Sequence, residues 1–430
     1  MAWALAGYLV AQGRQVRHFR ARGCYCGPQG ALTSTGSPSR HLDSWLMSRD
    51  ACRRALMEAY SAADFAIVEG EFSSGDEPSS ADGGSLEALC RMLDLPRLII
   101  LDAAQAADCR IPARPDAVDG VLIDGISDYE QFFQIQTCIE GAWGVPVVGG
   151  LARDEGIRQA LVSLPPGRVV PESICKALAA SFAQFVEPRL LNAIVDRPAL
   201  PIASTPAADF RKPVDGERPT IAIAYDDAFC GYFPELLEEL ERGGARIVDF
   251  SPLHDECVPE RADIVWLGCG RTDFHAEALS DNLCMHASLR NFARRGGRIY
   301  AEGGGCAYLG RTLKSADGIV YPMVNLLPLA AERRENGGLP VPVEFTPVGE
   351  NWLLPECRTL RAYRNRRWKL ELLEPIETLH EVDGSPTLVA TGNVVGGLMQ
   401  IHFGAAELLP ALLESPCEPA AQSVATSWPT

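Results

Sequence analysis

Short, almost continuous apolar runs recur along the chain, and segments with helical periodicity lie between them. In the first half these runs cover residues 65–70, 97–103, 119–126 and 144–151. Strands that read as unbroken apolar runs are buried on both faces, which is typical of a parallel sheet covered by helices. The pattern therefore predicts an α/β fold with a parallel sheet in the first half.

A second set of apolar runs begins at residue 220 and continues at 245–252, 262–270 and 297–305. A proline-rich stretch without periodicity separates the two sets, as in a linker. At 430 residues the chain is also too long for one ordinary core. We expect a first domain at residues 1–186, a linker at 187–218, a second domain at 219–416 and a flexible tail at 417–430.

The net charge of −17 argues against general nucleic-acid binding, which needs a basic face. No run approaches the ~20 apolar residues of a membrane helix, so no membrane association is expected. The N-terminal stretch has no basic region before its apolar part and is interpreted as a helix rather than a signal peptide. Fourteen cysteines occur without a CxxC pair, which favours reduced thiols in a cytoplasmic protein.

The segment RRGGRIYAEGGGCAYLG, residues 294–310, predicts a strand, a sharp turn and a helix. Several enzyme classes present a nucleophile at the apex of such a strained turn. The apex here is Gly303, which carries no nucleophile. Glycine accepts positive φ freely, so it keeps the turn while it removes the chemistry.

Three other segments carry a resemblance to a known family: TGSPSRHLDSWLM (35–47), VEG (68–70) and FSPLHDE (250–256). The chain resembles the cobyrinic acid a,c-diamide synthase family over about residues 1–415. These glutamine-dependent amidotransferases amidate carboxylates of tetrapyrroles. The resemblance implies an N-terminal dethiobiotin-synthetase-like domain of the P-loop NTPase type and a C-terminal domain like the class I glutamine amidotransferases.

The resemblance also implies that both members of the glutaminase pair are missing. The family motif Tyr-Ala-Glu-Cys-Gly-Gly places its thiol at Gly303, and the motif Tyr-Leu-His-x-His-Phe places its base at Gln400. Glutamine cannot take a proton at neutral pH. The family pattern GGGYPE appears here as residues 268–273, with Cys269 at its second position. We expect no glutaminase activity.

The synthetase half departs from the family as well. The chain begins at the helix that follows the family's Gly-Lys-Thr-Thr phosphate loop, so that loop is missing. Either the protein lacks it, or Met1 is a misassigned start just after it. The family segment Gly-Pro-Asp-Tyr-Ile-Asp-Pro aligns with residues 22–28, where both acids are replaced.

Three residues remain as nucleotide- or metal-binding candidates by this resemblance: Glu69, Asp76 and Ser85. The alternative is that the acids lie on a solvated loop and that Ser85 caps a helix. ATP and Mg²⁺ are the expected cofactors if the synthetase half is active; no metal site is assigned.

An arginine-rich segment at residues 357–372 stands out from the acidic background. Guanidinium groups bind carboxylates bidentately and aromatic rings stack on macrocycles, so the segment suits a carboxylated tetrapyrrole. The alternative is an exposed hairpin whose basic residues pair with acids. The tetrapyrrole-binding candidates are Tyr25, Arg361, Arg364, Arg366 and Arg367.

Two functions follow from these observations. The first is a degenerate family member, a pseudoenzyme that binds a tetrapyrrole or a protein partner. The second is an ATP-dependent ligase with a truncated start, which amidates tetrapyrrole carboxylates for cobalamin or related biosynthesis with ammonia or a partner's glutaminase. The resemblance also leaves a homodimer open.

Overall fold

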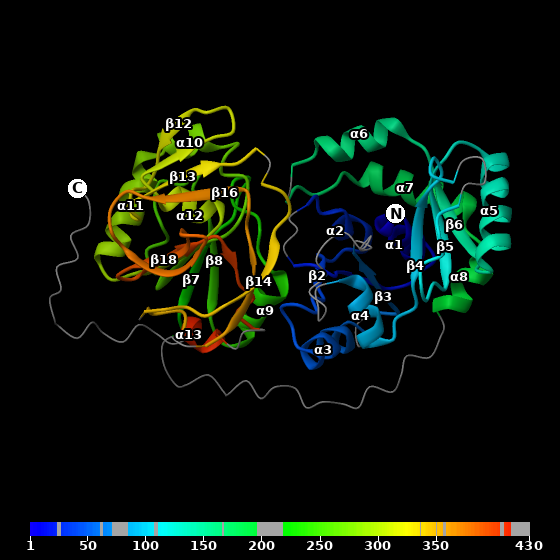
Figure 1. Cartoon of the computed structure of the whole chain (residues 1–430), viewed down its shortest axis with the longest axis horizontal. Coiled ribbons are helices and arrows are strands. Elements are labelled where there is room, and N and C mark those ends of the chain that lie inside the picture. Colours follow the sequence, from blue (N-terminus) through cyan, green and yellow to red (C-terminus); the bar gives the residue numbers. More distant parts are fainter. Residues whose placement is uncertain are drawn as a thin grey trace. The chain divides into compact units, whose positions relative to one another are not determined.

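The structure is a computed structural model, and it describes residues 1–23, 27–60, 63–70, 85–106, 111–165, 167–195, 218–335, 337–349, 351–355, 358–404 and 408–413 (Figure 1). The chain divides into two compact units. Unit 1 comprises residues 1–23 and 27–207, and unit 2 comprises residues 24–26 and 208–430.

Unit 1 contains two three-stranded sheets with helices around them. Its helices are α1 (Ala2–Ala11), α2 (Gly30–Thr35), α3 (Arg49–Tyr60), α4 (Leu86–Leu93), α5 (Tyr129–Trp143), α6 (Glu155–Ser163), α7 (Glu172–Phe185) and α8 (Pro188–Val195). Its strands are β1 (Val16–Arg20), β2 (Arg40–His41), β3 (Phe65–Glu69), β4 (Leu98–Asp102), β5 (Gly120–Ile126) and β6 (Val147–Ala152). The strand orders are β2-β1-β3 and β4-β5-β6, and every pairing is parallel.

Strands β5 and β6 are buried on both faces of the β4-β5-β6 sheet, which explains their unbroken apolar sequence. Successive side chains of a strand point to opposite faces. Val121 and Ile123 pack in one cluster with residues of α5, whereas Leu122 packs in another with residues of α1 and α7. Figure 1 shows α5 and α1 on opposite sides of β5 and β6. The predicted α/β class with parallel strands is confirmed.

The segment expected to be a linker begins with a helix. Helix α8 spans Pro188–Val195, and its side chains Leu191 and Ile194 are buried in the cluster that contains α1. The proline-rich composition of the stretch predicted a linker, and this short amphipathic helix was therefore not expected. The described part of unit 1 therefore extends past residue 186.

Unit 2 is built around a seven-stranded sheet with two smaller sheets beside it. Its helices are α9 (Pro234–Arg242), α10 (Ala276–Asp281), α11 (Leu283–Arg294), α12 (Gly304–Leu309) and α13 (Leu409–Leu413). Its strands are β7 (Thr220–Ala224), β8 (Arg246–Phe250), β9 (Ile264–Leu267), β10 (Arg298–Glu302), β11 (Thr312–Lys314), β12 (Val320–Pro322), β13 (Leu329–Arg333), β14 (Val341–Phe345), β15 (Leu360–Arg364), β16 (Trp368–Leu372), β17 (Glu377–Val382), β18 (Ser385–Thr391), β19 (Val394–Gly397) and β20 (Met399–Gln400).

The large sheet has the strand order β17-β18-β19-β10-β9-β7-β8. The five strands from β19 to β8 are parallel, and β17 and β18 are added antiparallel. Trp266 of β9 and Tyr300 of β10 are buried against Phe403, with ring centroids 5.1–5.9 Å apart. This aromatic group packs beside the carboxyl end of β10, where the predicted sharp turn with Gly303 at its apex begins; this turn is called the elbow below.

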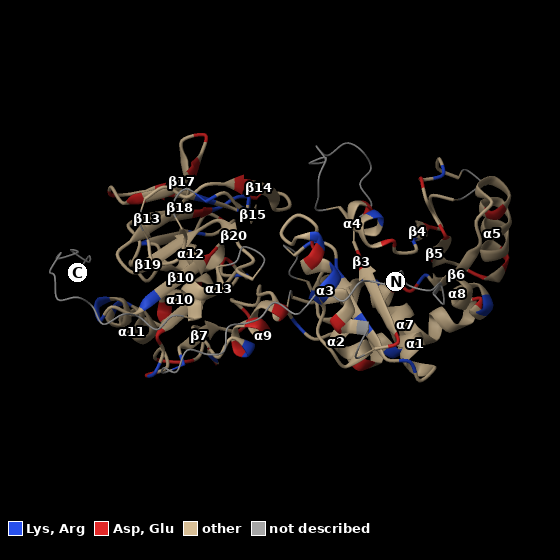
Figure 2. Ribbon diagram, turned by 90° about the horizontal axis from the view of Figure 1, so that it is seen from below, with Lys and Arg blue, Asp and Glu red and all other residues tan. Residues whose placement is uncertain are grey.

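Acidic and basic residues are interspersed over both units (Figure 2). None of the helices that the structure describes combines the length and the apolar character that a membrane crossing requires.

Replacement of Phe182 by alanine tests the core of unit 1. Its ring is fully buried on α7 and lies 5.6 Å from the ring of Tyr8. We expect Phe182→Ala to lower the free energy of unfolding by about 3–5 kcal/mol, the usual effect of removing a buried phenyl ring. Urea denaturation followed by circular dichroism measures it. Phe133→Ala is the matched control because Phe133 is 60% exposed; equal losses in the two variants would contradict the proposed packing.

Candidate functional site

Gly303 forms the turn between β10 and α12, as the sequence predicts for an elbow. Its backbone has φ 54° and ψ −111°, a region that residues with side chains rarely adopt. The preceding strand β10 lies between β9 and β19 in the large sheet. The turn therefore has the strained strand-to-helix form that displays a side chain at its apex, although the apex here is glycine.

The next two glycines are required by close packing. A Cβ on Gly305 would lie 2.2 Å from the carbonyl oxygen of Leu267, and a Cβ on Gly304 would lie 2.4 Å from Thr272 Oγ1. A side chain at Gly305 would require movement of β9, and one at Gly304 would require movement of the Thr272 side chain. Close packing therefore favours glycine at both positions.

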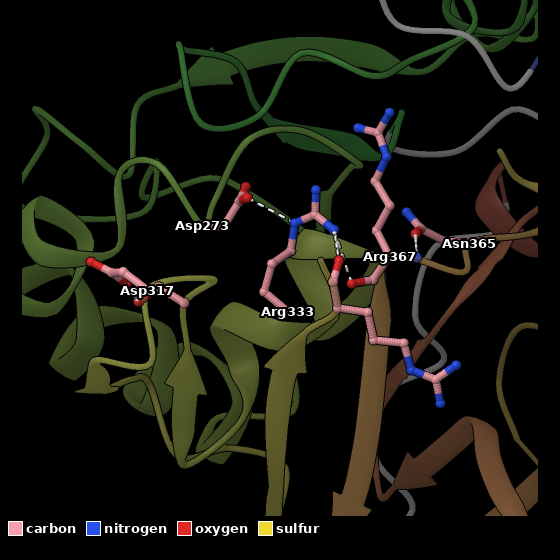
Figure 3. Close-up of polar contacts among 7 residues, drawn as sticks. Asp273, Asp317, Arg333, Asn365 and Arg367 are labelled. Carbon is pink, nitrogen blue, oxygen red and sulfur yellow. Dashed lines mark hydrogen bonds and ion pairs between the residues drawn. The ribbon is translucent and has the colours of Figure 1, made fainter. Parts of the chain in front are cut away.

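The space in front of Gly303 is occupied by side chains from two other segments. A Cβ built on Gly303 would lie 3.0 Å from Cys269 Sγ and 3.0 Å from Asn365 Nδ2. Asn365 belongs to the turn between β15 and β16, where its Oδ1 accepts a hydrogen bond of 2.9 Å from the backbone N–H of Arg367. Figure 3 shows this turn next to Arg333, which is paired with Asp273 at 2.8 Å.

Sequence reasoning did not find that Cys269, Thr272 and Asn365 surround the elbow. Cys269 could have been found from the sequence, because it stands where the family pattern GGGYPE has a glycine. Nothing local in the sequence brings Asn365 to Gly303, because 62 residues separate the two.

The residue in the predicted base position, Gln400, lies on β20 and is 8% exposed. His402, two residues further on, is also buried, and its Nε2 lies 3.6 Å from Glu235 Oε1 on α9. Its ring packs on Phe233 with a centroid distance of 4.9 Å. His402 therefore contacts the α9 side of the core.

Glu302 is a buried carboxyl group directly before the elbow. It is 1% exposed, and its Oε1 accepts hydrogen bonds from the Tyr300 hydroxyl at 2.8 Å and from Ile401 N at 3.3 Å. Burial raises the pKa of Glu302 to about 8, although these two hydrogen bonds act in the opposite direction. The group is accordingly protonated at neutral pH.

Cys306 follows Gly303 by three residues and is fully buried. Burial raises its pKa to about 12, so its thiol stays protonated. It faces the backbone of Gly396, where a Cβ would lie 3.2 Å from its sulfur. This thiol is part of the core.

The four predicted arginines do not form one group. Arg361 Nε pairs with Glu344 Oε1 at 2.8 Å across the β14–β15 ladder. Arg364 acts on His380 instead: the pKa of His380 is lowered by burial and, to a smaller extent, by the charge of Arg364. Arg366 and Arg367 are exposed on the turn that carries Asn365. Strands β15 and β16 lie in different sheets, so the segment is not a hairpin.

In unit 1, Glu69 ends β3 and contacts two basic side chains of β1. Its carboxylate oxygens lie 3.5 Å from His18 Nε2 and 3.5 Å from Arg20 Nε. Burial alone would raise the pKa of Glu69, but the hydrogen bond to His18 and the charges of His18 and Arg20 outweigh it and hold the pKa below its usual value. Glu69 is therefore an ionised, partly buried carboxylate.

A cavity of about 280 Å³ lies beside Glu69. The start of α1, Asp124 of β5 and Arg158 of α6 also line it, and Arg158 pairs with Asp124 at 2.9 Å. Cavities of this size with a few converging polar groups are the usual places for small ligands. His18, Arg20 and Arg158 were not among the predicted residues.

Ser85 is the N-cap of α4, and its side chain accepts a hydrogen bond of 3.1 Å from Ala88 N. Asp76 and Tyr25 lie outside the described residues, as do Cys24 and Cys26. Within the described ranges, no three His, Cys, Asp or Glu side chains are grouped so as to hold a metal ion.

Comparison with known proteins assigns this architecture to a class. Residues 220–337 match the family model of the CobB/CobQ-like glutamine amidotransferase domain, so unit 2 is a domain of the glutamine amidotransferase type. A solved structure described as a glutamine amidotransferase is 16% identical, covers 45% of this chain and superimposes with a TM-score of 0.35.

Relatives in the sequence comparison extend across both units. The cobyrinate a,c-diamide synthase of Herminiimonas arsenicoxydans is 31% identical over 76% of this chain and 73% of its own length. Those of Syntrophotalea carbinolica and Dehalococcoides mccartyi strain 195 are 30% and 28% identical over 76% and 92% of this chain, which correspond to 73% and 90% of their lengths. The chain belongs to the cobyrinate a,c-diamide synthase family.

The titration of Glu302 predicts a pH dependence of stability. Between about pH 4.5 and pH 8 the unfolded chain has released this proton and the folded protein retains it, so the free energy of unfolding falls as the pH rises. Glu302→Gln keeps the acceptor oxygen and removes the titration. We expect wild type to lose up to roughly 4 kcal/mol relative to Glu302→Gln between pH 5 and pH 8, at 1.36 kcal/mol per pKa unit. Urea unfolding at pH 5, 6.5 and 8 measures it; parallel curves would contradict a raised pKa.

Proposed function

We propose that this protein is a member of its family that has lost glutamine hydrolysis at the elbow and acts as a tetrapyrrole-binding or partner-binding subunit. The observation that carries the proposal is Gly303: the elbow keeps its strained backbone and has no side chain to attack an amide. In the best-studied hydrolase case, loss of the nucleophile costs on the order of 10⁶ in rate.

Two further observations support the proposal. By the family resemblance Gln400 stands in the base position, and a glutamine cannot accept a proton at neutral pH. A Cβ at position 303 would lie 3.0 Å from the side chains of Cys269 and Asn365, so these side chains would have to shift by a few tenths of an ångström to admit a nucleophile.

A second candidate function is supported by the cavity in unit 1. ATP-dependent amidation of a tetrapyrrole carboxylate, with ammonia or a partner's glutaminase as nitrogen source, needs a nucleotide site and Mg²⁺. Glu69 and Asp124 supply the hard oxygen donors that Mg²⁺ prefers, although each is paired with basic side chains. In this function Glu69, with Asp76 and Ser85 as further candidates, would hold the metal and nucleotide.

The ligand class follows from the relatives, which are named for cobyrinate a,c-diamide, a carboxylated tetrapyrrole product. Arg366 and Arg367 are exposed and suited to its carboxylates. Tyr25, Arg361 and Arg364 remain candidates. We propose a first domain that extends from residue 1 beyond residue 186 through α8, and a second domain at residues 219–416. A homodimer is an assembly to be tested.

ADP release distinguishes the two functions. The purified chain is given Mg-ATP, ammonium and a panel of carboxylated tetrapyrroles, so that glutamine is not needed. We expect macrocycle binding, seen as a shift of its absorption band, without macrocycle-dependent ADP release. ADP release that depends on the macrocycle would establish amidation instead, and Glu69→Gln should then lower it on the order of 10²-fold or more, whereas Glu130→Gln on the exposed start of α5 should not.

The loss of macrocycle binding in an arginine variant tests the ligand site. We expect Arg366→Ala with Arg367→Ala to weaken binding about tenfold for each carboxylate released, since a charge-assisted hydrogen bond contributes on the order of 1.5 kcal/mol. Arg295→Ala is the control because Arg295 is exposed at the end of α11. Equal weakening in the control would indicate attraction by charge alone, and no binding of any tetrapyrrole by wild type would overturn the ligand assignment.

Introducing a cysteine at position 303 and a histidine at position 400 tests whether these two residues alone are enough for glutamine hydrolysis. We expect no glutamine hydrolysis by wild type, and none by Gly303→Cys with Gln400→His, because the new Cβ would lie 3.0 Å from Cys269 Sγ and Asn365 Nδ2. Adding Cys269→Gly opens that space and should give measurable glutamate release. Hydrolysis by wild type would overturn the proposal.

A further inference from the structure

Strands β3 and β4 of unit 1 are partly exposed although their sequences are almost continuously apolar. Strand β3 has the sequence FAIVE, and all of its residues are half-buried. Strand β4 has the sequence LIILD, and its Ile100 is 51% exposed. Strands β5 and β6, which have similar sequences, consist mainly of buried residues. Because continuous apolar strands are typical of the interior of a parallel sheet, β3 and β4 combine the sequence of interior strands with the exposure of edge strands.

These two strands are the facing ends of the two sheets of unit 1. The strand orders are β2-β1-β3 and β4-β5-β6. Figures 1 and 2 both show β3 next to β4, with β5 and β6 beyond β4. Phe65 and Ile67 of β3 and Leu98 of β4 pack against one hydrophobic cluster, which also contains residues of α1. The two open edges therefore lie under the same helix.

The backbone of β3 has hydrogen-bonding groups that point away from β1. Ala21 N, which follows β1, donates a hydrogen bond of 2.8 Å to Glu69 O. In a parallel ladder the N–H and C=O of one residue point to the same neighbour, and those of the next residue point to the other side. Since β3 pairs with β1 without a register shift, the backbone groups of Ala66 and Val68 point to the open edge. Among the described residues no strand pairs with that edge.

Strand β4 presents the same kind of edge. Ala103 N, which follows β4, donates a hydrogen bond of 2.7 Å to Asp124 O of β5. The β4–β5 ladder is also without a register shift, so the backbone groups of Leu98 and Ile100 point away from β5. No strand within the described ranges pairs with them. Unpaired backbone groups in apolar surroundings cost free energy, and here they occur on two edges that face each other.

The outer edges of the same two sheets are protected. Strand β2 is only two residues long. Strand β6 is covered by the segment after α7, because Glu187 N donates a hydrogen bond of 2.8 Å to Val148 O. Short edge strands and covering segments are the usual ways in which proteins protect a sheet edge. The longer apolar edges of β3 and β4 have no such protection in the part of the chain that the structure describes.

We propose that one further strand pairs with both β3 and β4, parallel to them, and that polypeptide joined to the amino end of α1 supplies it. Its backbone accepts from and donates to Ala66, Val68, Leu98 and Ile100, which joins the two sheets into one. About five residues match the length of β3 and β4. The strand is apolar, because its side chains contact the layers that cover β3 and β4, and it has no proline, because both of its edges are paired.

The position of α1 identifies the source of the strand. Parallel strands end at the same edge of a sheet, and at this edge Glu69 ends β3. Glu69 lines the cavity of unit 1 together with Met1 and Ala2 at the start of α1. A strand parallel to β3 therefore ends near the start of α1. Parallel strands are connected through a crossover helix, and α1 is suited to connect the proposed strand with β1.

This inference goes beyond the proposed function. It concerns the sheet of unit 1, whereas the loss of glutamine hydrolysis and the arginine-rich turn concern unit 2. A failure to find the strand would leave the proposed function unaffected. Glutamine hydrolysis or a lack of tetrapyrrole binding would likewise leave the strand unaffected.

The test compares protein purified from the organism that encodes it with a recombinant chain of residues 1–430. We expect the intact mass of the purified protein to exceed the 46.5 kDa of residues 1–430, and peptide sequencing to find an apolar run before Met1. Hydrogen exchange at Ala66, Val68, Leu98 and Ile100 should be at least about tenfold slower than in the recombinant chain. The neighbouring amides, which bond to β1 and β5, are the internal reference.

Three results would overturn the proposal. The first is a purified protein that begins at Met1. The second is an extension without an apolar run. The third is equal exchange of these four amides in the two proteins. If the purified protein begins at Met1 and the amides are protected, a strand of another chain pairs with β3 and β4, and the proposed source is wrong.

Ile100→Asp tests the strand by stability. In residues 1–430 this side chain is 51% exposed, so the substitution should lower the urea midpoint only slightly. In the extended protein the new strand covers it, and we expect a clearly larger decrease, because a buried unpaired carboxylate is costly. Val320→Asp is the matched control, since Val320 lies on β12 of unit 2 and is 56% exposed. Equal effects of Ile100→Asp in the two proteins would contradict the proposal.

Discussion

The turn at Gly303 depends on a close approach of backbone to backbone. Gly305 lies so near the Leu267 carbonyl oxygen that no side chain fits, and Gly303 itself has a positive φ. The contact joins α12 to β9 and fixes where β10 ends in the large sheet. Because this constraint concerns the backbone alone, the turn has its strained shape although position 303 carries no side chain.

Side chains from two other segments of unit 2 lie against the apex of this turn. A Cβ on Gly303 would lie 3.0 Å from Cys269 Sγ and 3.0 Å from Asn365 Nδ2. Asn365 reaches this position from a turn that is distant in sequence. Close contacts of this kind are expected in a packed site, because an open position would cost its lining dispersion contacts. The surroundings of Gly303 are therefore set by packing between segments that are far apart along the chain.

The fold could be predicted from the sequence to a large extent because it rests on local patterns. The unbroken apolar runs at 119–126 and 144–151 become β5 and β6, each buried on both faces. Helix α8 was not predicted, because it is short and lies at the start of a proline-rich stretch; its side chains Leu191 and Ile194 are buried. The elbow was found from its glycines, whereas its lining was not, because residues 269, 272, 303 and 365 meet only through the tertiary fold.

Contacts made only in the tertiary fold also explain why Glu69 of unit 1 and Glu302 of unit 2 differ in charge state. Glu69 was a candidate because its motif is continuous in sequence, but its charge state depends on His18 and Arg20 of the neighbouring strand. Pairing with two basic groups keeps the carboxylate ionised, while Glu302, with only neutral partners, holds its proton near pH 7. Burial raises the pKa of both glutamates, which each end a parallel strand, but at Glu69 the basic neighbours outweigh it. The neighbours decide which of them can serve a cation and which of them is part of the core.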